Sequence, residues 1–250
     1  MKDFNLEGRT AVITGASRGI GLAVAQKLAQ YGAQCILVSR KAESLETAAA
    51  GIREMGLKAE AMVCHTGHPE QIKVLYEKIV EKYGSLDILV NNAATNPHFG
   101  EMITADENVW NKTLDVNIKG PFFMIKYAVP LMKNGGAIVN VASVNALKPG
   151  MYQGVYSATK AALVNMTQTL ARELAPKGIR VNALLPGLTD TKFASAIISS
   201  DKILNYALAQ IPMDRYAKPE ELAGAVLYLV SDAASFTTGA ALVCDGGMLA

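Results

Sequence analysis

Short runs of apolar and β-branched residues alternate along the chain with longer stretches in which apolar residues recur every three or four positions. The short runs are typical of buried strands, and the longer stretches are typical of helices with one apolar face. The pattern predicts seven strands, at residues 10–14, 35–39, 61–64, 88–90, 138–141, 179–184 and 241–244. The clearest helical stretches between them span residues 22–31, 42–55, 70–83 and 219–230.

Regular alternation of strand and helix predicts an α/β protein whose parallel sheet is covered by helices on both faces. The run Ile36-Leu37-Val38 is apolar without a break, which suits a central strand that is buried on both sides. A doubly wound sheet fits better than an eight-stranded barrel, because a barrel needs one more strand and helix. The 250 residues contain no linker or internal repeat, so we expect a single domain spanning residues 1–250.

Two stretches depart from this regular alternation. Residues 106–132 have a long helical pattern, but Pro121 lacks a backbone donor and should break or kink the helix near Asn117. Residues 188–216 carry many apolar side chains without a single apolar face. We expect this second stretch to form a mobile lid over a pocket.

Charge and composition exclude several classes of partner. Lysine and arginine total 24 against 22 acidic residues, and the net charge of +2 predicts neither a nucleic-acid nor a membrane partner. The three cysteines are far apart and the three histidines lack ligand spacing, so we expect buried thiols and no metal. The N-terminus shows no apolar signal core, and the sequence contains no run of 18 apolar residues. We therefore expect a cytoplasmic protein.

A glycine-rich turn follows the first predicted strand and leads directly into a helix. It reads Thr14-Gly15-Ala16-Ser17-Arg18-Gly19-Ile20-Gly21. Glycines let the backbone approach a pyrophosphate, and the amide groups at the helix N-terminus stabilise its charge. Because the turn lies between a strand and a helix, it favours a dinucleotide site over a purely structural turn.

The end of the second predicted strand indicates which dinucleotide is bound. Folds that prefer NAD usually place an acidic residue there, to bind the ribose hydroxyls. This chain has no carboxylate at that point. Arg40 can instead bind a 2′-phosphate with two hydrogen bonds, helped by the Ser39 hydroxyl and by the charge of Arg18. The pattern favours NADP(H) over NAD(H), the alternative being that Arg40 is only a solvated strand end.

Three polar residues are placed to act as a catalytic group. Tyr156 and Lys160 share one face of a predicted helix. Ser143 follows the fifth predicted strand, and the carboxyl ends of the strands surround the ligand crevice in such sheets. A free phenol, with a pKa of about 10, is a poor acid–base catalyst at neutral pH. A nearby ammonium group stabilises the phenolate, which lowers the pKa of the tyrosine toward the range in which it can exchange a proton at neutral pH.

Together with Asn91-Asn92-Ala93-Ala94, Asn117 and Pro186-Gly187, these motifs resemble the short-chain dehydrogenase/reductase family over nearly the whole chain. The resemblance implies a Rossmann fold. It also implies that Tyr156 protonates a carbonyl oxygen, that Ser143 hydrogen-bonds this oxygen, and that Lys160 holds the cofactor ribose and favours the tyrosinate. The backbone carbonyl of Asn117 would anchor a water molecule that leads from the lysine to solvent. The implied catalytic set is Ser143, Tyr156, Lys160 and Asn117.

The same resemblance assigns further cofactor contacts. Asn91 would border the adenosine ribose, and the Thr189 backbone and Thr191 hydroxyl would hold the nicotinamide carboxamide. His65 stands where the family often has an acidic residue that meets the adenine amine, and Ala94 stands where it often has glycine. The expected cofactor set is Gly15, Ser17, Arg18, Gly19, Ile20, Gly21, Ser39, Arg40, His65, Asn91, Ala93, Tyr156, Lys160, Pro186, Gly187, Thr189 and Thr191.

The segments Cys64-His65 and 92–100 look most like the NADPH-dependent carbonyl and retinal reductase branch, which implies reversible reduction of a ketone or aldehyde. The resemblance also implies a homotetramer, for which residues 109–132 and 158–174 offer apolar helical stretches. We expect a small apolar substrate, since the presumed pocket has no arginine cluster. Its expected residues are His98, Phe99, Ser143, Tyr152, Phe193, Ile197 and Met213.

Two other functions stay open. A 3-oxoacyl-[acyl carrier protein] reductase would share the catalytic residues, but Lys126, Lys133 and Arg172 are too scattered to establish a basic docking patch. A low-turnover NADP(H)-binding sensor or scaffold is a second alternative. The intact set of serine, tyrosine and lysine counts against it.

Overall fold

The computed structural model describes residues 2–250, which contain a seven-stranded parallel sheet of order β3-β2-β1-β4-β5-β6-β7. The order reverses between β1 and β4, so the sheet is doubly wound, as the sequence predicts. The strands are β1 (Thr10–Thr14), β2 (Gln34–Ser39), β3 (Ala59–Val63), β4 (Ile88–Asn91), β5 (Gly136–Val141), β6 (Ile179–Pro186) and β7 (Ala241–Cys244).

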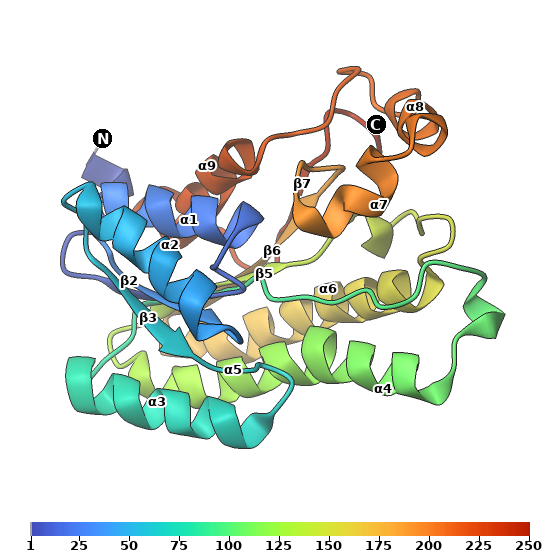
Figure 1. The fold of residues 1–250 in the computed structure, drawn as a ribbon. Helices are drawn as coiled ribbons and strands as arrows, with labels where there is room; N and C mark the ends of the chain where they lie inside the picture. Colours follow the sequence, from blue (N-terminus) through green and yellow to red (C-terminus); the bar gives the residue numbers. More distant parts are fainter. Residues whose placement is uncertain (1) are drawn as a thin grey trace.

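Helices cover both faces of the sheet (Figure 1). On one face lie α1 (Gly19–Gln30), α2 (Ala42–Glu54) and α9 (Pro219–Val230), and on the other lie α3 (Pro69–Tyr83), α5 (Gly120–Ala128) and α6 (Gly154–Leu174). Successive side chains of a strand point to opposite faces. In β1, Ala11 and Ile13 join one apolar cluster and Val12 joins the other. The unbroken apolar runs therefore mark strands that are buried on both sides.

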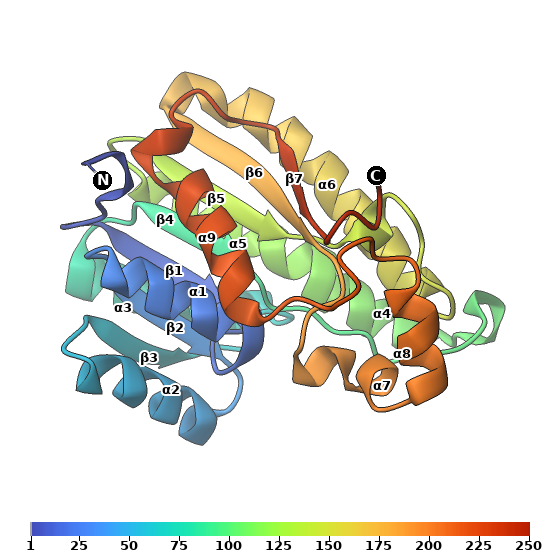
Figure 2. The same ribbon diagram turned by 90° about the horizontal axis from the view of Figure 1, so that it is seen from above.

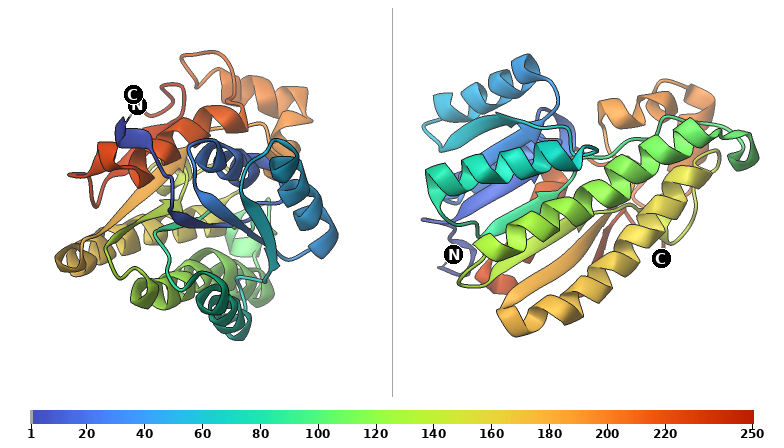
Figure 3. Two further views of the ribbon diagram at one scale, coloured as in Figure 1. Left: turned by 90° about the vertical axis from the view of Figure 1, so that its left-hand side faces the viewer. Right: turned by 90° about the horizontal axis from the view of Figure 1, so that it is seen from below.

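The remaining elements are short. They are α4 (Glu107–Leu114), α7 (Ser195–Ile198), α8 (Asp201–Leu208) and the 3₁₀ turns η1 (Lys2–Phe4), η2 (Met102–Thr104), η4 (Val129–Leu131), η5 (Val144–Ala146), η6 (Ala175–Lys177), η7 (Lys192–Ala194) and η8 (Asp232–Ala234). Figure 3 shows α3, α5 and α6 side by side beneath the sheet. Among residues 2–250 no helix combines the length and the apolar character that crossing a bilayer requires.

The helix break expected near Asn117 is present, and it takes the form of a π-helical segment. Residues Asp115–Lys119 form this segment, η3, between α4 and α5. Pro121 has no amide hydrogen to donate to the carbonyl of Asn117, four residues earlier. Gly120 is also required, because a Cβ there would lie 2.7 Å from the backbone oxygen of Thr66. The missing amide hydrogen of Pro121 and the close packing of Gly120 against Thr66 thus occur at the same point of the helix.

Residues 188–216 fold as η7, α7 and α8 and lie beyond the carboxyl ends of the strands (Figure 2). Ile211 is buried, and a Cβ on Gly246 would lie 2.8 Å from its side chain. The backbone amide of Met213 donates to the Gly246 carbonyl at 3.1 Å. The segment therefore covers the end of the sheet, and packing and a hydrogen bond connect it to the residues after β7. Its mobility stays a prediction.

Candidate active site

The ends of β1 and β4 are joined where the strand order reverses. Thr14 Oγ1 accepts hydrogen bonds from the backbone amides of Asn92 (2.9 Å) and Ala93 (3.0 Å). The Asn92 side-chain amide donates to the Thr14 carbonyl at 2.9 Å. Gly15 has a φ of +66°, and a Cβ there would lie 2.8 Å from Asn92 Nδ2. Glycine at this position therefore allows both the left-handed turn and the close approach of the second loop.

The N-terminus of α1 offers backbone donors for a phosphate. Arg18 is the N-cap residue, its backbone is extended, and no side chain caps the helix. The amides of the first turn have no partner within the helix. A Cβ on Gly19 would lie 3.1 Å from the Thr191 methyl group, so the 186–191 loop contacts the glycine turn. The residues expected to hold pyrophosphate and carboxamide are thus neighbours.

The residues expected to hold a 2′-phosphate lie together at the carboxyl end of β2. Ser17 Oγ and Ser39 Oγ are 3.3 Å apart, which joins the glycine turn to the end of β2. The side chains of Arg18 and Arg40 are both exposed. Burial, His68 and Arg40 together lower the pKa of His65, which shows that the Arg40 charge acts at the end of β3. These cations and hydroxyls fit a phosphate group.

Ser143 and Tyr156 lie near each other beyond the end of β5. Ser143 is the N-cap of η5, and its hydroxyl oxygen accepts a hydrogen bond from the Asn145 amide at 3.1 Å. Tyr156 is buried on the first turn of α6. Burial raises the pKa of Tyr156, and a hydrogen bond with Ser143 opposes that rise. The serine is therefore placed to stabilise negative charge on the tyrosine oxygen.

Lys160 is buried beside the tyrosine, with 2% of its surface exposed. Its Nζ atom donates to the Val141 carbonyl at 2.7 Å and lies 5.5 Å from the centre of the Tyr156 ring. Burial lowers the pKa of Lys160 to about 7. A lysine with this pKa changes its charge near neutral pH.

Asn117 is connected to the tyrosine through Thr159. The Asn117 Nδ2 atom donates to Thr159 Oγ1 at 3.1 Å, and this hydroxyl donates to the Tyr156 carbonyl at 2.7 Å. The Asn117 amide also pairs with both backbone groups of Thr95, at 2.8 and 3.0 Å. The structure thus gathers all four expected catalytic residues. The sequence analysis missed Thr159, although its position three residues after Tyr156 could have indicated it.

Asn91 is, with Lys160, among the most buried of the expected cofactor residues. Its side chain is buried and donates to Asn140 Oδ1 at 2.9 Å, while its own Oδ1 has no partner. Asn140 donates in turn to Thr167 Oγ1 at 2.9 Å, so the chain of amides braces β4 and β5 against α6. A contact between Asn91 and the adenosine ribose stays a prediction.

One aromatic side chain lies against Tyr156, and a second aromatic pair lies in the loops after β4 and before α6. The Phe193 ring lies 5.4 Å from the Tyr156 ring, measured between centroids, and the Phe99 ring lies 5.9 Å from the Tyr152 ring. Tyr152 has a φ of +61°, which is uncommon for a residue with a side chain. Its carbonyl accepts a hydrogen bond from Gly100 at 3.0 Å, so the loops after β4 and before α6 are joined.

The other expected pocket residues are less closely connected to the tyrosine. His98 Nε2 lies 3.1 Å from the Glu101 carbonyl oxygen and 3.3 Å from Thr104 Oγ1, both in its own loop. Ile197 is half-buried on α7, and the exposed Met213 packs toward Gly246. The structure shows no contact between these three side chains and Tyr156, so their roles stay predictions.

Two polar residues beside Ser143 were missed by the sequence analysis. The Asn145 Nδ2 atom donates to Gln153 Oε1 at 2.6 Å, while the Asn145 backbone amide binds Ser143. The Gln153 carbonyl accepts from the backbone and hydroxyl of Ser157, both at 2.8 Å. Asn145 stands two positions after Ser143, and Gln153 stands three positions before Tyr156. This closeness in the sequence could have indicated that both belong to the site.

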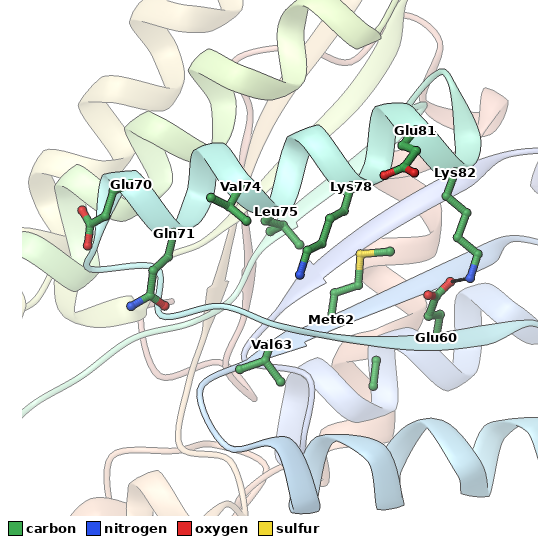
Figure 4. A pocket seen from close by; sticks show the side chains of 11 residues that line it. Glu60, Met62, Val63, Glu70, Gln71, Val74, Leu75, Lys78, Glu81 and Lys82 are labelled. Atoms are coloured by element: carbon green, nitrogen blue, oxygen red, sulfur yellow. Dashed lines mark ion pairs between the residues drawn. The ribbon is translucent and has the colours of Figure 1, made fainter.

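A hollow at the outer edge of the sheet is separate from this site (Figure 4). It lies between the edge strand β3 and α3, and a 2.7 Å ion pair joins Lys82 to Glu60 across one end. None of the expected catalytic, cofactor or pocket residues lines it. Within residues 2–250, no cluster of three or more histidine, cysteine or acidic side chains could hold a metal ion.

Comparisons with known proteins agree with this arrangement. Residues 15–249 match the family model described as enoyl-(acyl carrier protein) reductase. The chain is 41% identical to dehydrogenase/reductase SDR family member 4 of Oryctolagus cuniculus over 244 residues, covering 97% of this chain and 94% of that protein.

Solved structures are similar over the whole fold. A gluconate 5-dehydrogenase from Burkholderia cenocepacia, in complex with NADP and tartrate, has a TM-score of 0.94 and 31% identity, over 98% of this chain and 97% of that one. The L-sorbose reductase from Gluconobacter frateurii, complexed with NADPH and L-sorbose, has a TM-score of 0.92 and 35% identity, over 99% and 98%. The protein therefore belongs to the short-chain dehydrogenase/reductase family of oxidoreductases.

Proposed function

We propose that this protein reduces a ketone or aldehyde to an alcohol with NADPH, and catalyses the reverse oxidation when concentrations favour it. The observation that carries the proposal is that the Lys160 Nζ atom lies 5.5 Å from the centre of the buried Tyr156 ring, with Ser143 nearby after the end of β5. A proton donor, an oxyanion donor and a cation then meet beyond the strand ends, where such sheets bind ligands.

NADP(H) is the cofactor that best fits the end of β2. Arg40 and Arg18 are exposed cations beside the linked hydroxyls of Ser17 and Ser39. A guanidinium group matches a 2′-phosphate, whereas sites for NAD usually carry an acid at this point. The bound NADP and NADPH in the two similar enzymes support the same choice.

The nicotinamide supplies the hydride, so the protein has to place the substrate and manage one proton. Tyr156 gives its proton to the oxygen that becomes the alcohol. Ser143 accepts a hydrogen bond from the Asn145 amide and keeps its own hydrogen to donate to the substrate oxygen or to the tyrosine. Lys160 in its ammonium form favours the tyrosinate that remains.

Asn117 completes the proposed proton path. Its side chain is engaged with Thr95 and Thr159, so we assign the binding of water to its backbone carbonyl. Pro121 cannot donate to that carbonyl. We assign the Asn117 carbonyl to a water molecule through which Lys160 regains a proton from solvent after it has passed one to the tyrosinate.

A small apolar carbonyl compound is the proposed substrate class. The Phe193 ring lies against Tyr156, and the Phe99–Tyr152 pair adds aromatic surface in the loops after β4 and before α6. A hydroxylated ketone is the second candidate. The side-chain amides of Asn145 and Gln153 lie beside Ser143 and could bind a substrate hydroxyl.

A screen of NADPH oxidation tests the proposal. The panel contains aryl ketones, diketones, retinal, ketoses and acyl thioesters, and NADH replaces NADPH in parallel reactions. We expect turnover of at least one carbonyl class that is lost in Tyr156→Phe. Exclusive turnover of acyl thioesters would favour a carrier-protein reductase. Tight NADPH binding without any turnover would favour a sensor or scaffold.

A cytoplasmic location and a homotetramer complete the proposal. Phe122, an apolar side chain of α5, is 44% exposed and could be buried in an assembly. Light scattering tests the oligomeric state, and a monomeric mass would contradict a tetramer. Cell fractionation tests the location.

A further inference from the structure

His65 follows β3 at the carboxyl edge of the sheet, next to the strand that carries Arg40. The Cys64 amide donates to the Ser39 carbonyl at 3.1 Å, so the two strand ends are held together. The half-buried His65 ring is surrounded by positive groups. Burial, His68, Arg40 and Lys112 lower its pKa, and a backbone hydrogen bond of His65 itself opposes them. Glu70 Oε1 lies 3.3 Å from His68 Nδ1. The His65 ring is therefore neutral near pH 7.

The contacts of His65 determine which ring nitrogen carries hydrogen. The Gly67 amide donates to His65 Nδ1 at 3.0 Å, so Nδ1 is an acceptor and the neutral ring carries its hydrogen on Nε2. Gly67 also covers this edge of the ring, since a Cβ there would lie 3.0 Å from Cε1. The His65 backbone amide donates to Gln71 Oε1 at 2.9 Å (Figure 4 shows Gln71 at the start of α3). The Nε2–H group is what remains for a ligand.

If Arg40 binds the 2′-phosphate, the purine of the same nucleoside extends toward the end of β3. Neighbouring strands are about 4.8 Å apart, which is comparable to the reach of a purine from its sugar-bearing nitrogen to its far edge. That far edge differs between purines. Adenine presents an amine, which donates, and hypoxanthine presents a carbonyl, which accepts. A group that can only donate pairs with the carbonyl and not with the amine.

We propose that His65 donates its Nε2–H to the far edge of the cofactor purine, so that the site accepts a 6-oxopurine at least as well as adenine. This inference rests on the proposed binding of NADP(H). It makes His65 a specificity-determining residue of the cofactor site. A carboxylate in its place would accept from the amine and select adenine.

Fluorescence titration with NADPH and with its hypoxanthine analogue tests the inference. For the unchanged protein we expect the analogue to bind at least as tightly as NADPH and up to about tenfold more tightly, because the Nε2–H group pairs with the carbonyl and not with the amine. In His65→Asp the analogue should bind about tenfold more weakly than NADPH, which is the effect of one selective hydrogen bond. His68→Asp places the same charge on the neighbouring residue and should leave the ratio unchanged.

The possible results separate the two proposals. If the unchanged protein binds the analogue more than about threefold more weakly than NADPH, the inference is overturned. It is also overturned if folded His65→Asp, checked by circular dichroism, keeps the original ratio. If His65→Asp does not fold, the ratio in the unchanged protein decides. Failure of the unchanged protein to bind NADPH would instead remove the proposed function.

Discussion

The ammonium nitrogen of Lys160 lies 5.5 Å from the centre of the Tyr156 ring and donates a hydrogen bond to the Val141 carbonyl. One turn of α6 separates the two residues, and the end of β5 supplies the acceptor. Helix and strand together therefore determine where the lysine charge lies.

Replacing Tyr156 with Phe should reduce turnover by about 10²- to 10⁴-fold, the usual contribution of a positioned acid–base group. NADPH binding should persist, because the ring and its contact with Phe193 remain. Steady-state kinetics and fluorescence titration measure the two effects. Substantial residual reduction of the same substrate would contradict the role of the phenol.

Replacing Arg40 with Asp should weaken NADPH binding by about 10- to 100-fold, since a charge-assisted hydrogen bond contributes about 1.5–3 kcal/mol. NADH binding should change little or improve. Lys78→Asp is the matched control, because it makes the same charge change on α3 in the hollow between β3 and α3. Equal weakening of NADPH and NADH would argue against recognition of the 2′-phosphate.

The stability of the protein without added cofactor should depend on pH through Lys160. Its folded pKa of about 7 lies below the unfolded value of about 10.4, so the unfolded chain binds more protons between these values. Relative to Lys160→Met, the free energy of unfolding of the unchanged protein should therefore rise from pH 6.5 to pH 9, by about 2–3 kcal/mol. Chemical denaturation at each pH measures the difference. Parallel pH curves would be inconsistent with a buried lysine of lowered pKa.

Replacing Pro121 with Ala supplies an amide hydrogen that can bond to the Asn117 carbonyl. We expect this variant to lower kcat, because the carbonyl would no longer be free to hold the water of the proposed proton path. Its melting temperature should stay the same or rise, since a helical hydrogen bond is gained. An unchanged kcat would remove the Asn117 carbonyl from the mechanism. Thr167→Val, which removes a buried hydroxyl farther along α6, serves as a control for indirect structural effects.

Substituting Thr159 with Val removes the hydroxyl that joins Asn117 to the first turn of α6. We expect a loss of about 1–3 kcal/mol in the free energy of unfolding, because the Asn117 amide loses a buried partner. Thermal and chemical denaturation measure the loss. Thr169→Val is the matched control, since its exposed hydroxyl bonds only to a carbonyl of its own helix. Equal effects of the two substitutions would show that the Asn117 contact contributes nothing specific.

The order of strands and helices could be predicted from the sequence because each element encodes its own periodicity. The run Ile36-Leu37-Val38 indicated a buried strand, and β2 contains it. Pro121 indicated a helix break near Asn117, because a missing amide hydrogen is a local property of one residue. The seven strands and the doubly wound sheet were predicted in this way, with strand ends that differ by at most two residues. The glycine turn and the placement of Tyr156 beside Lys160 depend on equally local spacing.

Contacts between distant parts of the chain could not be predicted from that periodicity. The hydrogen bond between Asn117 and Thr159 joins residues 42 positions apart. The hydrogen bond between Asn92 and Thr14 joins residues 78 positions apart. The donor role of His65 depends on how Gly67 lies against its ring. Such contacts exist only after the sheet and its helices have packed, because burial and hydrogen-bond geometry are properties of the assembled fold. The sequence by itself determined which elements form and which chemical groups they carry, and the tertiary structure decided which of those groups meet.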